Sequence, residues 1–318
     1  MNTNNDRRAH DLLLVSQPNS GSTWFSNCIA KANPAIAMYP KEFFNPVLNQ
    51  KYYEALAPHL GCELYPCIGN IAKELDAATV DKILTDSWHK EPYNFTKEVF
   101  FSFCAEVFSR RFHTFGVTRD ISYTFPPLTV RVVGWYVACF HSIMSHGLAD
   151  CELKGFLRST ATDLQRQAVA GWQLMRWRMD WALDRIGCEV FDFDQLMTAS
   201  EDSLAEDLAK IQSPLIDPVL TARQIVESRV SPTPADMKPH ALEWRETLGY
   251  HSDLVRRFEQ PFMNPVPSSN ELVSTSSVAM QIRRDILAIR EPWMTTPHTG
   301  WAQAMEAVLS IPSLRESH

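Results

Sequence analysis

The sequence has no run approaching the ~18 consecutive apolar residues that predict a membrane-crossing helix. Residues 1–11 are polar and lack the apolar core of a secretory signal peptide. The formal net charge is −7, so the chain lacks the basic excess typical of a broad nucleic-acid-binding surface. We therefore expect a cytoplasmic protein with no transmembrane segment and no nucleic-acid partner.

Cysteine is sparse, and its spacing follows no disulfide or zinc pattern. The seven cysteines are scattered along the chain, at positions 28, 62, 67, 104, 139, 151 and 188. An odd number of scattered cysteines is typical of reduced thiols rather than of a disulfide framework. Cys62 and Cys67 are not followed by a second pair, and no acidic cluster is visible, so we expect no metal site.

The length and composition favour one large α/β domain, alone or with an appendage. The chain has 318 residues, of which 45% are hydrophobic. Residues 261–277 are rich in proline and serine, as in a linker, and residues 278–314 contain one good helical pattern. We therefore divide the chain into a domain at 1–260 and a helical C-terminal extension at 261–318. The extension could pack on the core, cover a binding site or join two subunits of a homodimer.

The most informative stretch is residues 12–27, LLLVSQPNSGSTWFSN. Residues 12–15 are consecutively apolar, which is typical of a buried parallel strand. Residues 18–21 are turn formers, and a helical pattern begins at Ser22. A strand, a Gly/Ser turn and a helix aim backbone N–H groups and the positive end of a helix dipole at a phosphate. Gly21 would let the backbone approach that anion closely.

This turn has neither the GxxxxGK[ST] spacing nor the lysine of a Walker A motif, which disfavours a P-loop kinase-like phosphotransferase. It resembles the 5′-phosphosulfate loop of the sulfotransferase family, P-[KR]-S-G-[ST]-[ST]-W/L. The matching positions are Pro18, Ser20, Gly21, Ser22, Thr23 and Trp24. Asn19 is the misfit, because the family carries a cation at that position.

Glu42 lies in a second stretch that resembles the same family. Residues 40–46, PKEFFNP, resemble the E-[FWY]-F element of the bacterial trehalose-type branch, in which the glutamate is the proposed general base. A carboxylate beside Tyr39 and Phe43 would be partly desolvated, which favours its protonated form and suits it to proton transfer. The alternative is a surface glutamate paired with Lys41.

Residues 112–120 are β-rich and end in Thr-Arg-Asp. They resemble the family's strand end whose arginine holds the 3′-phosphate of the nucleotide, and the planar fork of Arg119 suits bidentate phosphate binding. A structural Arg–Asp pair is the alternative. In the family a hydroxyl from the next helix completes this site, but Pro126 and Pro127 interrupt that helix here. The candidates for this position therefore stay open: Ser122, Thr124, Thr129 or, in the serine's place, Gly134.

Later segments are mostly architectural. We expect short strands at 35–38 and 188–193, a β-prone segment at 93–103, and helices at 103–108, 159–186 and 203–211. Gly187 would end the longest helix, and Asp194 would cap the turn after residue 193. Residues 190–196 resemble the family's closing V-x-Y-E-D-L segment. The WRETL sequence resembles its late basic segment, which implies that Arg245, with Lys238 as a further candidate, touches the 3′-phosphate; an exposed helix start is the alternative.

The resemblance covers residues 12 to about 258 and implies a three-layer α/β fold, a central parallel sheet flanked by helices, of the P-loop NTPase-like sulfotransferase type. It implies transfer of a sulfuryl group from the co-substrate 3′-phosphoadenosine 5′-phosphosulfate (PAPS) to a hydroxyl or amine of a small-molecule or carbohydrate acceptor, without a metal. Glu42 would be the base, and the backbone N–H groups of residues 20–24 would hold the 5′-phosphate.

Asn19 weakens the expected contact to the leaving phosphate, because its amide is a neutral donor. Another cation could replace the missing one, and the candidates are Lys41, Lys97 and Arg245. The alternative is a nucleotide-binding protein that has lost catalysis.

Overall fold

The computed structural model describes residues 11–43, 86–99, 102, 105–109, 111–124, 133–134, 136–137, 139–141, 144, 151–229 and 245–258. The chain divides into two compact units. Unit 1 comprises Met1–His59, Leu75–Asp120 and Met179–Pro232, and unit 2 comprises Leu60–Glu74, Ile121–Arg178 and Thr233–His318. Each unit is described by itself. The expected C-terminal extension at 261–318 lies outside the described residues.

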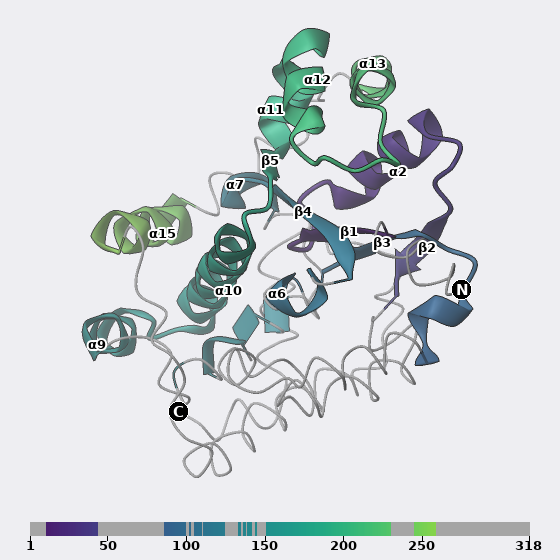
Figure 1. The fold of residues 1–318 in the computed structure, drawn as a ribbon. Helices are drawn as coiled ribbons and strands as arrows, with labels where there is room; N and C mark the ends of the chain where they lie inside the picture. The colour runs from purple at the N-terminus through teal and green to yellow at the C-terminus, as the bar shows by residue number, and fades with distance from the viewer. Residues whose placement is uncertain are drawn as a thin grey trace, which may run out of the picture. The chain divides into compact units, whose positions relative to one another are not determined.

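Unit 1 is built on a parallel β-sheet (Figure 1). Among the described residues the sheet has five strands in the order β2-β3-β1-β4-β5. The strands are β1 (Asp11–Ser16), β2 (Met38–Glu42), β3 (Phe95–Glu98), β4 (Phe112–Thr118) and β5 (Val190–Asp192). All neighbouring strands pair in parallel. Every residue of β1 is buried, which explains its apolar run, since a central parallel strand is covered on both faces.

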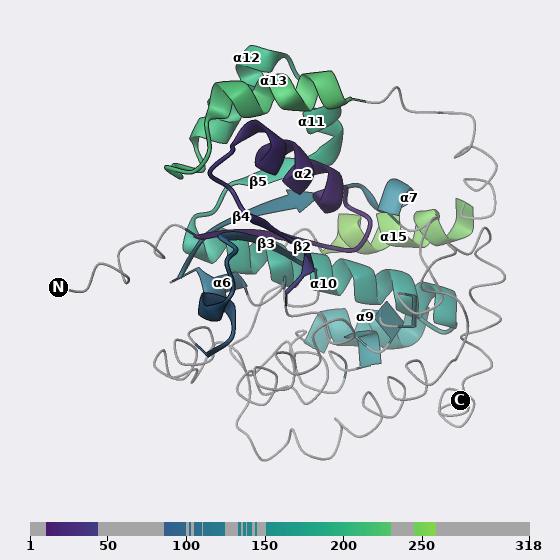
Figure 2. The same cartoon turned by 90° about the vertical axis from the view of Figure 1, so that its right-hand side faces the viewer.

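Helices cover one face of this sheet (Figure 2). They are α2 (Ser22–Ala32), α11 (Phe193–Thr198), α12 (Glu201–Ala209) and α13 (Pro218–Ser228). Helix α2 lies next to the strands, and α12 and α13 lie beyond it. The side chains buried between this layer and the sheet include Leu12, Leu14, Phe25, Ile29, Phe115, Val117, Phe191, Leu196, Leu208 and Ile225. Fully burying an aliphatic or aromatic side chain contributes about 1.5–3 kcal/mol, so this layer anchors the start of α2 firmly to the strands.

The C-terminal part of α10 (Leu164–Ile186) covers the opposite face of β4. Phe115 and Val117 face the α2 side, so Gly116 between them faces away from it. A Cβ atom at Gly116 would lie 2.7 Å from Cδ1 of Leu183 in α10. Helices therefore lie on both faces, and the prediction of an α/β fold with a central parallel sheet flanked by helices is confirmed.

The strand order makes β1 the point at which the sheet changes its direction of winding. After β1 the chain passes to β2 and β3 on one side of it, and then crosses to β4 and β5 on the other. In open α/β sheets ligands bind outside the carboxyl ends of the strands at such a switch point. The short helices η2 (Trp88–Lys90) and α6 (Ala105–Phe108) precede β3 and β4.

The second strand starts later than the sequence suggests. We expected a strand at 35–38, but β2 runs from Met38 to Glu42. The side chain of Asn94 explains the shift: its amide donates to the carbonyl of Ala35 and its oxygen accepts from the N–H of Ala37. These backbone groups are thereby satisfied outside the ladder. The strand is displaced so that Glu42 becomes its last residue.

Several helix assignments also differ from prediction, and α12 and α6 have slightly different bounds from the helices expected at 203–211 and 103–108. The helix expected at 159–186 is two helices, α9 (Cys151–Thr160) and α10, because Asp163 accepts from the N–H of Arg166 and starts a new helix. Asp192, rather than Asp194, caps α11, since its Oδ1 accepts from the N–H groups of residues 194 and 195. Helix α13 was not expected, although Asp217 followed by Pro218 is a helix-start signal.

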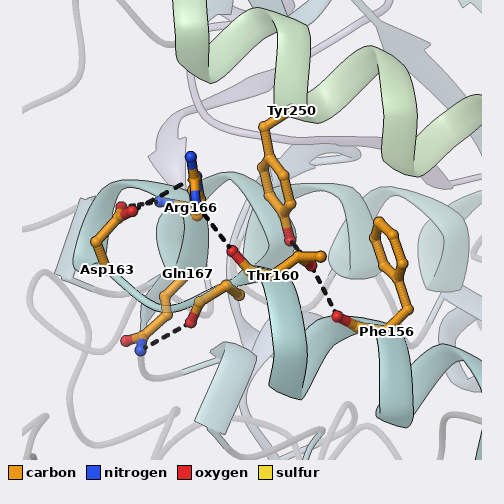
Figure 3. A network of polar contacts seen from close by, with 7 residues as sticks. Phe156, Thr160, Asp163, Arg166, Gln167 and Tyr250 are labelled. Carbon is orange, nitrogen blue, oxygen red and sulfur yellow. Dashed lines mark hydrogen bonds and ion pairs between the residues drawn. The ribbon is translucent and has the colours of Figure 1, made fainter.

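Unit 2 is helical where it is described: α7 (Ile121–Thr124), α9, α10 up to Arg178, and α15 (Arg245–Arg257). Tyr250 of α15 joins the junction of α9 and α10 (Figure 3). The hydroxyl of Thr160 donates to Tyr250 Oη at 3.4 Å, and the guanidinium of Arg166 lies 5.7 Å from the tyrosine ring centroid. Burial raises the pKa of Tyr250, which keeps this phenol neutral. None of the described helices has both the length and the apolarity needed to cross a membrane.

A candidate anion-binding site at the carboxyl edge of the sheet

The register of unit 1 brings the carboxyl ends of all five strands to one edge. Val15 of β1 pairs with Glu98 of β3, and Ser16 pairs with Val117 of β4. The outer strands follow the same alignment, with Glu42 of β2 opposite Lys97 and Asp192 of β5 opposite Thr118. The loop after β1 therefore lies between the end of β3 and the end of β4. The predicted strand, turn and helix at 12–29 are confirmed, and their turn occupies the switch point.

Asn19 has a conformational role in that loop. The N–H and the hydroxyl of Ser20 both donate to the carbonyl of Gln17, at 3.3 and 2.8 Å, which closes a four-residue turn. Asn19, its third residue, has a φ of 60° and an exposed side chain. A positive φ at this position is required by a type II turn, and asparagine tolerates it better than lysine or arginine does. The residue that misfits the phosphosulfate loop therefore suits the backbone of this turn.

Gly21 occupies a position that no other residue could take without strain. Its φ is 83°, and a Cβ atom there would lie 2.1 Å from Cε2 of Phe193. Phe193 also packs edge-on against Trp24, with ring centroids 5.5 Å apart. We had interpreted the segment around Phe193 as architectural only. The structure instead places its ring against Gly21 of the loop. The alternating pattern of residues 188–193 does not predict this long-range contact.

Helix α2 begins directly after Gly21 and has no side-chain cap on its first N–H groups. The N–H of Phe25 donates to the carbonyl of Gly21 and forms the first helical hydrogen bond. The N–H groups of Ser22, Thr23 and Trp24 precede it and have no partner within the helix, which is the arrangement that binds anions. The indole of Trp24 donates to the carbonyl of Ser228, so this side chain ties α2 to α13.

Ser16 adds a buried polar atom beneath the loop. It is the last residue of β1 and is fully buried. In the described part of the chain its hydroxyl has no hydrogen-bond partner. Buried hydroxyls in native proteins are nearly always hydrogen-bonded, so an orphaned one at the switch point is typical of a site that receives a polar ligand.

Glu42 and Lys97 form an ion pair at the ends of β2 and β3. Their side chains are only 16% and 9% exposed. We considered Lys41 as the partner of Glu42, but the structure pairs Glu42 with Lys97, and Lys41 is exposed. Lys97, one of the three cations that we considered as replacements for a loop cation, is therefore held beside the predicted base.

Arg119 follows β4 on the other side of the loop. Its guanidinium lies 4.6 Å from the centroid of the Phe193 ring, and its Nε lies 3.7 Å from Oδ1 of Asp194. The arginine side chain is 20% exposed. Burial raises the pKa of Asp194; Arg119 opposes this shift, while the carboxylates of Asp192 and Asp120 add to it. Phe193 thus connects the glycine of the loop with the predicted 3′-phosphate ligand.

The other candidate residues are not gathered at this edge by the described structure. Ser122 and Thr124 lie in α7 of unit 2, where the hydroxyl of Thr124 donates to the carbonyl of Ile121. Gly134 also belongs to unit 2. The remaining candidates fall outside the described residues or side chains: Thr129, Lys238 and the side chain of Arg245.

The candidate residues that the structure places at this edge of the sheet come from segments far apart in the chain. They are Asn19, Ser20, Gly21, Ser22, Thr23, Glu42, Lys97, Arg119, Phe193 and Asp194. No protein-family model matches the chain, and no curated protein matches it. The chemistry of the site is therefore argued from its own geometry.

Proposed function

We propose that this chain is a PAPS-dependent sulfotransferase with a P-loop NTPase-like sulfotransferase fold. The observation that carries the proposal is the ion pair between Glu42 of β2 and Lys97 of β3, because β3 is the strand beside β1 and its loop. A candidate base and a cation thus lie at the same edge of the sheet as the start of α2, the candidate anion site. The strand order β2-β3-β1-β4-β5, with the loop after β1, supports the fold assignment.

Donor binding uses both sides of the loop. The N–H groups at the start of α2, with the hydroxyls of Ser22 and Thr23, hold the 5′-phosphate of PAPS. Arg119 holds the 3′-phosphate, for which its fork of N–H donors is suited. Lys97 contributes a positive charge from β3, and Asn19 contributes a neutral amide from the loop.

Transfer is an in-line displacement at sulfur. Glu42 accepts the proton of the acceptor hydroxyl or amine as its oxygen or nitrogen forms a bond to sulfur. The bond between sulfur and the bridging oxygen of the 5′-phosphate breaks, and its electron pair stays on that oxygen. Lys97, released from Glu42, stabilises the charge developing there. The products are the sulfated acceptor and 3′-phosphoadenosine 5′-phosphate (PAP). The acceptor class that we propose is a small molecule or carbohydrate.

A second candidate function follows from the turn at Asn19. Because the loop carries no cation of its own, the same site suits a nucleotide-binding protein that does not catalyse transfer. A P-loop kinase-like phosphotransferase is less favoured, since the loop has no Walker lysine to contact the β- and γ-phosphates.

The test combines a binding and a turnover measurement on the full chain. PAP should raise the melting temperature more than adenosine 5′-phosphate or ATP with magnesium does, because a ligand of the folded state stabilises it by mass action. Labelled PAPS, incubated with a mixture of hydroxyl and amine acceptors, should yield labelled sulfated product. Binding without turnover would favour the second candidate, and absence of binding by PAP would reject both.

A further inference from the structure

We propose that Asp194 determines the affinity of this site for 3′-phosphorylated nucleotides, by occupying Arg119 until the 3′-phosphate displaces it. This inference rests on the proposed function, because it takes Arg119 as the 3′-phosphate ligand. It adds a specificity-determining residue that makes no lasting contact with the nucleotide. The competition between Asp194 and the 3′-phosphate lowers the affinity for PAP, the product, and so speeds its release.

The geometry places Asp194 where it competes with a ligand phosphate for the same guanidinium. The face of that guanidinium lies on the Phe193 ring, 4.6 Å from its centroid, so ligands approach Arg119 at its N–H edge. Asp194 Oδ1 lies 3.7 Å from Nε on that edge. This distance exceeds the range of a hydrogen bond, about 2.7–3.2 Å, so the contact is mainly Coulombic and is readily exchanged.

Asp194 is also dispensable for the local fold. The helix start that follows β5 is capped by Asp192, whose Oδ1 accepts from the N–H groups of Asp194 and Gln195 at 2.8 and 3.0 Å. The carbonyl of Asp194 accepts from the hydroxyl of Thr198. These bonds use only backbone atoms of residue 194. Its carboxylate, which is 45% exposed, is therefore able to turn toward solvent without breaking the helix.

The charges around Arg119 strengthen the competition. Asp120 and Asp192 lie close enough to Asp194 to raise its pKa, so several carboxylates share one neighbourhood with Arg119. A phosphate dianion that arrives there meets repulsion from the Asp194 carboxylate unless that group moves away or becomes neutral. Like-charge juxtaposition of this kind lowers affinity for a ligand that places a phosphate beside Arg119 and has less effect on a ligand without a 3′-phosphate.

The test measures dissociation constants of PAP and adenosine 5′-phosphate by isothermal titration calorimetry. Asp194→Asn should bind PAP roughly 3- to 10-fold more tightly than the wild type, since one competing ion pair and its repulsion are lost. Adenosine 5′-phosphate, which lacks the 3′-phosphate, should change less than about twofold. Asp184→Asn is the matched control, because it removes the same charge from an exposed position on α10. Asp184 precedes β5 and so lies toward the amino ends of the strands, and its variant should leave both dissociation constants unchanged.

Two further variants keep the inference falsifiable. Asp194→Ala should tighten PAP binding as Asp194→Asn does, which excludes an effect of the new amide. In an Arg119→Ala background, Asp194→Asn should improve PAP binding by less than about twofold, because the contested guanidinium is absent. Unchanged or weaker PAP binding by both Asp194 variants, equal gains for the two nucleotides, or an undiminished gain without Arg119 would overturn the inference. If the wild type binds neither nucleotide, the proposed function fails first and this inference with it.

Discussion

The ammonium group of Lys97 lies against the carboxylate of Glu42, and the pair joins the carboxyl ends of β3 and β2. Both side chains are largely removed from water. Separating such a pair leaves a poorly solvated charge, which is costly unless a new partner is present. Under the proposed function, an anionic donor bound at the neighbouring loop would supply that partner for Lys97. The pair therefore couples donor binding to release of the base under the proposed function.

Glu42→Gln should lower the rate of sulfuryl transfer about 100- to 10,000-fold, which is the usual contribution of a general base. The amide keeps the shape of the side chain, so the dissociation constant of PAP should change little. Single-turnover kinetics and calorimetry give the two quantities. Glu206→Gln, an exposed position on α12, is the matched control and should behave as the wild type. Full turnover by the Glu42 variant would reject Glu42 as the base, and His89 and His141 would then be tested in that role.

Lys97→Ala should reduce turnover at least about tenfold, whereas Lys41→Ala should leave it within about twofold. A charge-assisted hydrogen bond is worth about 1.5–3 kcal/mol against about 0.5–1.5 for a neutral one, and about 1.4 kcal/mol corresponds to tenfold in rate. Because losing Lys97 also leaves the carboxylate of Glu42 without its ion-pair partner, Lys97→Arg is included to preserve the charge and the fold. Equal sensitivity of the two lysines would remove Lys97 from the transfer step.

Asn19→Arg should raise turnover only modestly if Lys97 already serves the leaving oxygen. The gain expected from replacing a neutral donor by a cation is at most on the order of tenfold, and the strain of arginine at φ 60° reduces it. The measurement is kcat for the variant against the wild type. Activity in the variant where the wild type has none would identify the natural protein as a binder.

Gly21→Ala should destabilise the protein by about 2–4 kcal/mol, because alanine is strained at φ 83° and its Cβ would meet the Phe193 ring. Urea denaturation measures the free energy of unfolding. Gly155→Ala in α9 is the control: nothing lies near its Cβ, so alanine should be neutral or slightly stabilising. In a double-mutant cycle, Phe193→Ala should recover part of the loss at Gly21. Purely additive effects would contradict the contact between the two residues.

Asp194 should make folding stability fall as pH rises through the acid range. Its folded-state pKa is raised above the ordinary value of 3.8, chiefly by burial, so the folded protein binds more protons than the unfolded chain between those two values. The contribution of this group is most favourable below 3.8 and is lost as pH increases through the raised value. Subtracting the pH–stability profile of Asp194→Asn from that of the wild type isolates the contribution of Asp194 to the free energy of unfolding. A difference that rises with pH would show the opposite shift.

The described cysteines should differ strongly in reactivity. Burial, with Glu189 nearby, raises the pKa of Cys188 to about 12, and burial also raises the pKa of Cys28. At pH 8 a thiol with such a pKa is only about one part in ten thousand thiolate, and the thiolate is the reactive form. Cys151 is exposed and should be alkylated by iodoacetamide before either of them, as peptide mass spectrometry would show. Rapid modification of Cys188 in the native protein would contradict its raised pKa.

The local chemistry of the chain was sufficient to predict β1, its turn and the start of α2. Residues 12–15 form an apolar run without a polar face, and Pro18 and Gly21 have backbone preferences that end a strand wherever it lies. The strand before Arg119 was predicted from the β-forming residues of 112–118. Boundaries failed where a side chain from elsewhere intervened, as Asn94 does before β2.

The sequence by itself thus determined which short segments present N–H groups, an arginine and a carboxylate. Only the tertiary structure decided which of them meet. Lys97 pairs with Glu42 across 55 positions, Phe193 lies against Gly21, and Asp194 lies against Arg119. These contacts depend on the strand order and register, and on the hydrophobic core that the strands share with α2, α11 and α13. Such a core forms from many residues that are far apart in the sequence. No local pattern in the chain therefore predicts which of the site residues contact one another.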